Sequence, residues 1–155
     1  MINREHFIIL SMQHIGIPYL WGGKDPRKGL DCSGMAEICL RILGIDPKGV
    51  QNSQMLYDYF ILHGRSMNRV DGDQIDLGDL MFFGKSGNHI SHVGVYIGLN
   101  MYLESAGGDH TTTSMSEAVR RQAFVKLSPV DHRKDLVSII RPDGIQWART
   151  FSPPG

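Results

Sequence analysis

Along the first part of the chain, apolar residues recur every three or four positions, a spacing typical of helices with one buried face. Three helices are predicted on this basis, and they cover Arg4–His14, Cys32–Leu43 and a segment from a cap at Asn52 or Ser53 to about His63. Gly16 and Pro18 end the first helix, because the residue before a proline is pushed out of the helical region. Gly44 follows the second helix at a position typical of a C-terminal cap.

After Gly78 the pattern changes to short runs rich in β-branched and aromatic residues, separated by glycine and polar residues. Five such runs are predicted as strands: "DLMFFG", "HVGVYIG", "MYLES", "AFVKL" and "LVSIIR". Helices followed by strands are typical of an α+β domain. We therefore expect N-terminal helices packed on an antiparallel sheet of about five strands.

The length of 155 residues and a hydrophobic content of 41% suit one domain with its own core. We expect this single domain to cover residues 1–143. Beyond it the sequence lacks a strong period and ends in Pro153-Pro154-Gly155. Residues 144–155 are therefore predicted to form an irregular C-terminal extension.

Sixteen basic residues balance sixteen acidic ones, and like charges do not form runs. The chain thus lacks the charge pattern of a nucleic-acid or anionic-membrane partner, and neither is expected. The longest apolar run near the start, Phe7–Leu10, is too short for a signal-peptide core or a membrane span. We expect a soluble protein that is cytoplasmic, released by a specialised route or carried in a phage particle.

Two cysteines, Cys32 and Cys39, fall on the second predicted helix. A rise of about 1.5 Å per residue sets their Cα atoms roughly 10 Å apart, beyond the roughly 7 Å that a disulfide allows. Both thiols are therefore expected to be free. Cys39 lies among apolar residues two turns inside the helix and is predicted to belong to the core.

Cys32 has three possible roles: a buried structural thiol, a zinc ligand or a nucleophile. Free cysteines are among the most buried residues, which favours the first. A zinc site would have to combine Cys32 with His89, His92 and His110, of which only the first two histidines form a close pair, so no metal site is expected.

The position of Cys32 at a helix start, after the glycine-rich loop Tyr19–Leu30, favours the role of a nucleophile. A helix amino end carries partial positive charge, which stabilises a thiolate. Its free N–H groups can also receive a developing oxyanion.

A thiol nucleophile needs a base, and His92 is the best candidate. It begins a predicted strand in which it shares one face with Gly94, Tyr96 and Gly98. A histidine at a strand start is by itself more often a polar edge residue, so its role depends on Cys32.

Glu104 on the next strand could orient the imidazole of His92. If Gly98–Asn100 forms a three-residue hairpin loop, the two side chains lie diagonally on one face, with backbones about 7 to 8 Å apart. A two-residue loop without a bulge would instead present Leu103 and Ser105. Ser105 and Asp109 are the next candidates for the orienting group.

Four blocks, "PYLWGG", "DCSGM", "DLGDLMFF" and "HVGVYIG", occur in this order between Ile17 and Ala106. In sequence and separation they resemble the NlpC family of cell-wall cysteine peptidases, which have a compact papain-like fold. The resemblance implies that the usual substrate is peptidoglycan, or muropeptides derived from it, cut between γ-D-glutamate and the diamino acid of the stem peptide. No cofactor is expected.

The resemblance also implies roles for individual residues. Cys32 attacks an amide carbonyl, His92 activates the thiol, and the residue at the position of Glu104 orients the histidine. The Tyr19 hydroxyl helps to bind the oxyanion. The family pattern assigns the substrate pocket to two further residues, Asp31 and Ser33. Trp21 either lines the cleft as a substrate-binding residue or packs the loop.

Two features depart from the family pattern. The family usually has histidine or a neutral amide where Glu104 stands, and a carboxylate there favours imidazolium. The stretch "GVQNSQ" replaces a basic or threonine-rich stretch that relatives often carry. The alternative functions are an amidase or acyltransferase on the same fold, and a non-catalytic scaffold that binds cell-wall fragments.

Overall fold

The computed structural model describes residues 1–149. Its helices are α1 (Arg4–Met12), α2 (Cys32–Ile42), α3 (Ser53–Leu62) and α4 (Met115–Arg121). Its strands are β1 (Lys24–Asp25), β2 (Gly29–Leu30), β3 (Gly64–Met67), β4 (Leu80–Ser86), β5 (His89–Gly98), β6 (Met101–Ala106), β7 (Phe124–Pro129) and β8 (Leu136–Pro142). The three predicted N-terminal helices and five predicted strands are all present, within a few residues at their ends.

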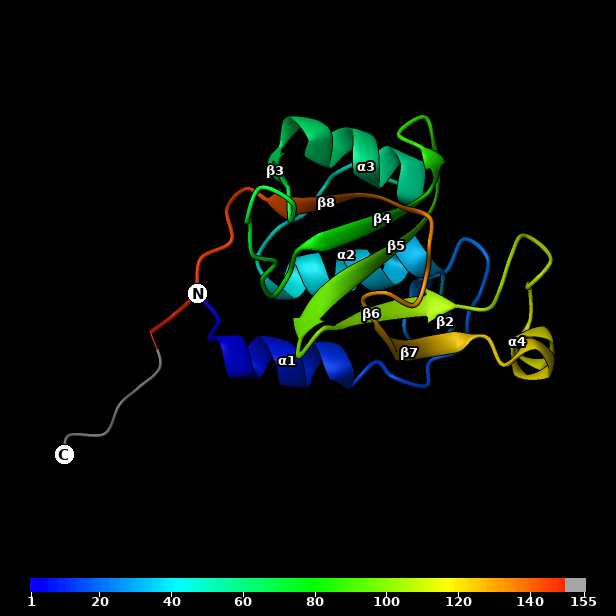
Figure 1. Ribbon diagram of the computed structural model, residues 1–155. Coiled ribbons are helices and arrows are strands. Elements are labelled where there is room, and N and C mark those ends of the chain that lie inside the picture. Colours follow the sequence, from blue (N-terminus) through cyan, green and yellow to red (C-terminus); the bar gives the residue numbers. More distant parts are fainter. Residues whose placement is uncertain (150–155) are drawn as a thin grey trace.

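Six strands form one antiparallel sheet in the order β3-β8-β4-β5-β6-β7, and β1 and β2 form a separate small hairpin. Figure 1 shows α2 behind the central strands, with α3 and α1 on either side of it. The predicted α+β class is therefore confirmed. The sheet has one strand beyond the five predicted, because β3 (GRSM) is a polar edge strand in which only Met67 is buried.

The start of α2 is fixed by Asp31, whose side-chain Oδ1 accepts a hydrogen bond of 2.7 Å from the N–H of Gly34. An aspartate in this position satisfies one of the free N–H groups of the first helical turn. Gly34 packs so closely on the carbonyl of Gly23 that a Cβ atom there would collide with it. The glycine-rich loop therefore lies directly against the amino end of α2.

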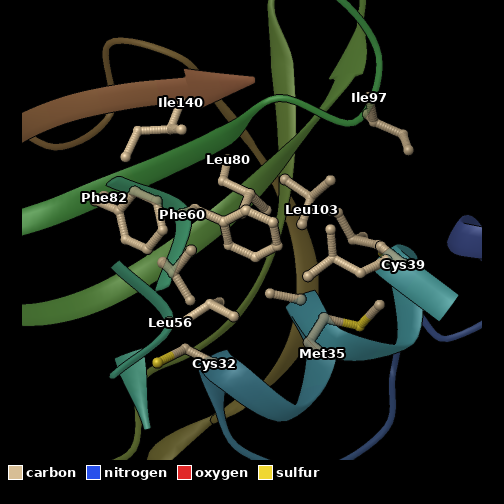
Figure 2. Close-up of a cluster of buried hydrophobic side chains, with 14 of the residues drawn as sticks. Cys32, Met35, Cys39, Leu56, Phe60, Leu80, Phe82, Ile97, Leu103 and Ile140 are labelled. Carbon is tan, nitrogen blue, oxygen red and sulfur yellow. The ribbon is translucent and has the colours of Figure 1, made fainter. Parts of the chain in front are cut away.

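The main core lies between the helices and one face of the sheet. Figure 2 shows Met35 and Cys39 of α2, Phe60 of α3, and Leu80 and Phe82 of β4 gathered in this one cluster. The other face of the sheet carries a smaller cluster, made of Met67, Met81, Phe83, Tyr102 and Ile139. The sheet is thus buried on both faces around its central strands.

The β5–β6 hairpin sets which residues share a face. Gly98 pairs with Met101, so the loop is the two-residue segment Leu99-Asn100, with φ values of +53° and +57°. The register shifts between Tyr96 and Gly98, where the bulge inserts one residue. This bulge restores the alternation that a three-residue loop would give, so Glu104 lies on the same face as His92.

The segment after β8 returns to the N-terminus. Trp147 forms a β-bridge with Ile2, and its ring packs edge-on against Phe7 at 5.6 Å. Residues 150–155 of the expected C-terminal extension lie outside the described residues. None of the helices within residues 1–149 is long and apolar enough to cross a membrane.

Candidate active site

Cys32 is the first residue of α2 and lies at the edge of the core, with 8% of its surface exposed. It lines a cleft of about 680 Å³. Its place at the amino end of an eleven-residue helix puts the thiol beside backbone N–H groups that have no partner within the helix. The position therefore suits a negatively charged sulfur or oxygen atom.

His92 and Glu104 form a buried pair on neighbouring strands. The Nε2 atom of His92 lies 2.7 Å from Oε1 of Glu104, and both side chains are almost fully enclosed. Phe83 packs against the imidazole, with ring centroids 5.6 Å apart. Because Nε2 is bound to Glu104, Nδ1 is the ring nitrogen left to face the Cys32 thiol, which interacts with the imidazole and helps to raise the pKa of His92. The three side chains thus form a continuous chain.

The charged forms of His92 and Glu104 stabilise each other. Burial disfavours the charged imidazole, but hydrogen bonds and charge interactions with Cys32 and Glu104 outweigh it and raise the pKa of His92 to about 9. Burial of Glu104 opposes its ionisation, yet the bond to His92 and the charge of the ring lower the pKa of this carboxyl. The arrangement therefore favours an imidazolium paired with the Glu104 carboxylate.

Tyr19 also lines the cleft, together with Cys32 and Asp31, and its side chain is buried. Burial, followed by the negative charges of those two residues, raises the pKa of the Tyr19 hydroxyl. The tyrosine therefore keeps its proton and can donate a hydrogen bond. Its ring lies on Gly108, where a Cβ atom would collide with it.

The remaining predicted residues surround the cysteine. Asp31 and Ser33 line the cleft, and the Ser33 hydroxyl donates a 2.9 Å hydrogen bond to Oδ1 of Asp31. Trp21 lines the cleft as well and is 55% exposed, with its ring edge-on to His110 at 6.2 Å. Trp21 thus lies at the cleft, and its part in substrate binding stays a prediction.

Three further segments line the cleft that sequence reasoning did not assign to the site. They are Gln51–Gln54, Ile90–Ser91 and Gly108–His110. Gln54 accepts a 2.8 Å hydrogen bond from the N–H of Ile90 and donates one of 2.8 Å to the carbonyl of Gly87. It thereby ties α3 to the strand that carries His92. The signal available in the sequence was "GVQNSQ", which departs from the family pattern.

Two histidines considered for a zinc site, His89 and His110, contact different neighbours. His89 is exposed beside Ser86, at 3.2 Å, whereas His110 packs on Trp21. Within residues 1–149 no three His, Cys, Asp or Glu side chains come together in a way that could hold a metal ion.

Solved structures with the same fold include two with nearly complete coverage of this chain. The NlpC/p60 domain of the peptidoglycan hydrolase SagA matches with a TM-score of 0.63 and 25% identity, over 90% of this chain and 99% of that one. An NlpC/P60 family protein from Bacillus cereus matches with a TM-score of 0.68 and 20% identity, over 93% of this chain and 41% of that one.

Curated relatives are longer proteins. Murein DD-endopeptidase MepH of Escherichia coli is 33% identical over 117 residues, which cover 74% of this chain and 41% of MepH. The bifunctional muramidase/DL-endopeptidase CwlT of Bacillus subtilis is 34% identical over 91 residues, 57% of this chain and 25% of CwlT. The gamma-DL-glutamyl hydrolase of Bacillus subtilis is 29% identical over 107 residues, 66% of this chain and 23% of the hydrolase. The chain spans less than half the length of each.

The family model for the NlpC/P60 family matches residues 16–128, which include all the predicted site residues. This range is most of the chain, and it carries the four sequence blocks from which the resemblance was inferred. The chain belongs to the NlpC/P60 family.

Proposed function

We propose that this chain is a cysteine endopeptidase that hydrolyses peptidoglycan stem peptides at the bond between γ-D-glutamate and the diamino acid. The observation that carries the proposal is the contact chain Cys32–His92–Glu104, whose first member lines the cleft. The names of two relatives, a DL-endopeptidase and a gamma-DL-glutamyl hydrolase, support this choice of bond.

In the proposed first step, the Cys32 thiolate adds to the amide carbon, and the carbonyl oxygen becomes an oxyanion. N–H groups at the start of α2 and the Tyr19 hydroxyl donate hydrogen bonds to it. One such donor is worth about 3 to 4 kcal/mol of barrier. The His92 imidazolium then gives its proton to the leaving amine, and a thioester on Cys32 remains.

In the second step, His92, now neutral, takes a proton from water while the water oxygen attacks the thioester. The carbon–sulfur bond breaks, and the acid product and the thiolate–imidazolium pair are formed. Glu104 keeps Nε2 of His92 occupied throughout, so that Nδ1 faces the reacting atoms. All groups of this mechanism and all strands of the sheet fall within residues 1–143, which we propose as the catalytic domain.

A DD-endopeptidase activity is the second candidate, because MepH carries that name and is 33% identical. The two activities cut different bonds and release fragments of different mass. Mass spectrometry of the soluble products from purified peptidoglycan therefore separates them from each other and from an amidase.

The test is digestion of purified peptidoglycan by the wild-type chain and by Cys32→Ala. We expect fragments ending at γ-D-glutamate from the wild type and at least about a 10⁴-fold loss in the variant, since the nucleophile is missing. Cys39→Ala, on the same helix, is the matched control and should digest normally. Wild-type digestion by Cys32→Ala would refute the proposal, as would binding without any cleavage by the wild type.

A further inference from the structure

Tyr102 on β6 buries a polar group that has no visible partner. Its side chain is fully enclosed, and its hydroxyl oxygen has no hydrogen-bond partner within residues 1–149. A buried hydroxyl without a partner is costly, because it has given up its hydrogen bonds to water, and such groups are rare in folded proteins. A charged acceptor, the Glu104 carboxylate, lies two residues further along the same strand.

Tyr102 lies on the face of the sheet that carries the His92–Glu104 pair. Residues two apart in a strand point to the same side, so Tyr102 and Glu104 share a face. The Tyr102 ring covers Gly94 of β5, where a Cβ atom would collide with it. Phe83 packs against this ring and against the imidazole of His92, with centroids 5.5 and 5.6 Å apart. The tyrosine is therefore held beside the pair by close packing.

The Tyr102 hydroxyl and the Glu104 carboxyl also influence each other's ionisation. Burial, followed by the charge of Glu104, raises the pKa of the Tyr102 hydroxyl, which therefore keeps its proton and can donate a hydrogen bond. Burial opposes the ionisation of Glu104, but His92 and then the hydroxyl groups of Ser128 and Tyr102 lower the pKa of this carboxyl. A neutral donor and a buried carboxylate thus lie together.

The charged groups around this pair have other hydrogen-bond acceptors. Arg133 donates two hydrogen bonds to Asp135, at 2.9 and 2.7 Å. Lys126, opposite Glu104 on β7, donates one of 3.2 Å to the carbonyl of Gln122. The titratable and polar groups around His92 and Glu104 are Cys32 from α2, Tyr102 from β6, Lys126 and Ser128 from β7, and Arg133 and Asp135 from the segment before β8. The hydroxyl groups are therefore the donors best suited to Glu104.

We propose that Tyr102 is a positioning residue whose hydroxyl donates a hydrogen bond to the Glu104 carboxylate and so holds this carboxylate against His92. The proposal rests on the proposed function, because it assigns a role within the same Cys32–His92–Glu104 chain. The bond gives the buried hydroxyl an acceptor and keeps the buried carboxylate ionised, as an imidazolium partner requires. Without the hydroxyl, Glu104 binds a proton more readily and holds the imidazole less firmly.

The first test needs no substrate. Carbon NMR of a chain labelled at its glutamate carboxyl groups follows the protonation of Glu104, whose signal is the one missing from Glu104→Gln. Tyr102→Phe removes only the hydroxyl, and we expect the Glu104 titration to move to higher pH. Tyr96→Phe is the matched control, because Tyr96 pairs with Tyr102 across the hairpin but its hydroxyl accepts a 3.2 Å hydrogen bond from the N–H of Asn100. The control should titrate as the wild type does.

The second test measures turnover of peptidoglycan fragments. In Tyr102→Phe we expect kcat to fall about tenfold, as for the loss of one hydrogen bond to a charged group. KM should change by less than about twofold, since Tyr102 is not among the residues that line the cleft. The acid limb of kcat/KM should move to higher pH together with the Glu104 titration. In the Glu104→Gln background, Tyr102→Phe should cost less than about twofold, because the ionised acceptor is absent.

The outcomes separate this proposal from the proposed function. An unchanged Glu104 titration in Tyr102→Phe, or a tenfold loss that persists in the Glu104→Gln background, would overturn the role of Tyr102. A raised melting temperature of Tyr102→Phe with a wild-type pH profile would do the same, because it would mean that the hydroxyl stays unpaired. A shifted Glu104 titration together with no hydrolysis by the wild type would instead overturn the proposed function alone.

Discussion

The two cysteines of α2 share a helix and a residue type but occupy different surroundings. Cys39 is 1% exposed and lies in the main core, and burial raises the pKa of its thiol to about 12. Cys32 lies at the helix start, on the cleft, and interacts with His92. The amino end of the helix therefore offers the conditions for a reactive sulfur, and its middle does not.

This contrast shows that the fold supplies the chemistry through position. At Cys32, free N–H groups, an imidazole and a cleft meet because α2 begins there, beside β5. Two turns later the same helix is covered by apolar side chains, and Cys39 behaves as a small hydrophobic residue. The difference between the two cysteines can be tested by replacing one cysteine, or one of its partners, at a time.

The largest difference should be in alkylation by iodoacetamide. We expect Cys32 to react at neutral pH more than about a hundredfold faster than Cys39, because only the thiolate reacts and only Cys32 is accessible. The rates can be measured by mass spectrometry on Cys39→Ala and Cys32→Ala, each of which retains one thiol. His92→Ala should slow the labelling of Cys32 and leave that of Cys39 unchanged. Equal rates for the two thiols would remove the contrast.

A smaller effect concerns the pH at which the site works. Because the pKa of His92 is raised to about 9, the imidazolium and the activity should be lost as the pH rises through about 9. Glu104→Gln removes one of the groups that raise this pKa, so the alkaline limb should move to lower pH. We also expect kcat/KM to fall by at least about tenfold.

The measurement is kcat/KM as a function of pH for the wild type and for Glu104→Gln. The folded-state pKa of His92 lies above the ordinary value of 6.5, so the ion pair stabilises the fold fully below about pH 6.5. That contribution is lost as the pH rises through about 9, and Glu104→Gln should flatten this part of the stability curve. An unchanged alkaline limb in Glu104→Gln would assign the orienting role to another group.

Helices and strands that are determined by the local sequence could be predicted well. The helix at Cys32 follows from its apolar spacing and from Asp31, a residue type suited to an N-cap. Strand β5 likewise follows from alternation within one segment. Both are decided by neighbours in the chain, which the sequence displays directly.

Glu104 shows where such reasoning stops. Its face depends on the bulge between Tyr96 and Gly98 and on Leu99 and Asn100 at positive φ, a loop without the Asn-Gly or Asp-Gly signal of such turns. The cleft residues of "GVQNSQ" and around His110 are a second case, because only the tertiary fold brings these distant segments to Cys32.

The smallest expected effect is that of Cys39→Ala. Removing a buried sulfur leaves a small cavity, which should lower the free energy of unfolding by about 1 kcal/mol and the melting temperature by about 2–4 °C. Because Cys39 touches none of the reacting groups, kcat/KM should stay within about twofold of the wild type. Thermal unfolding and peptide hydrolysis, measured on the same preparation, check the expected stability and the expected activity. A loss of activity without a loss of stability would mean that the middle of α2 takes part in the chemistry. The proposed difference between Cys39 and Cys32 would then be wrong.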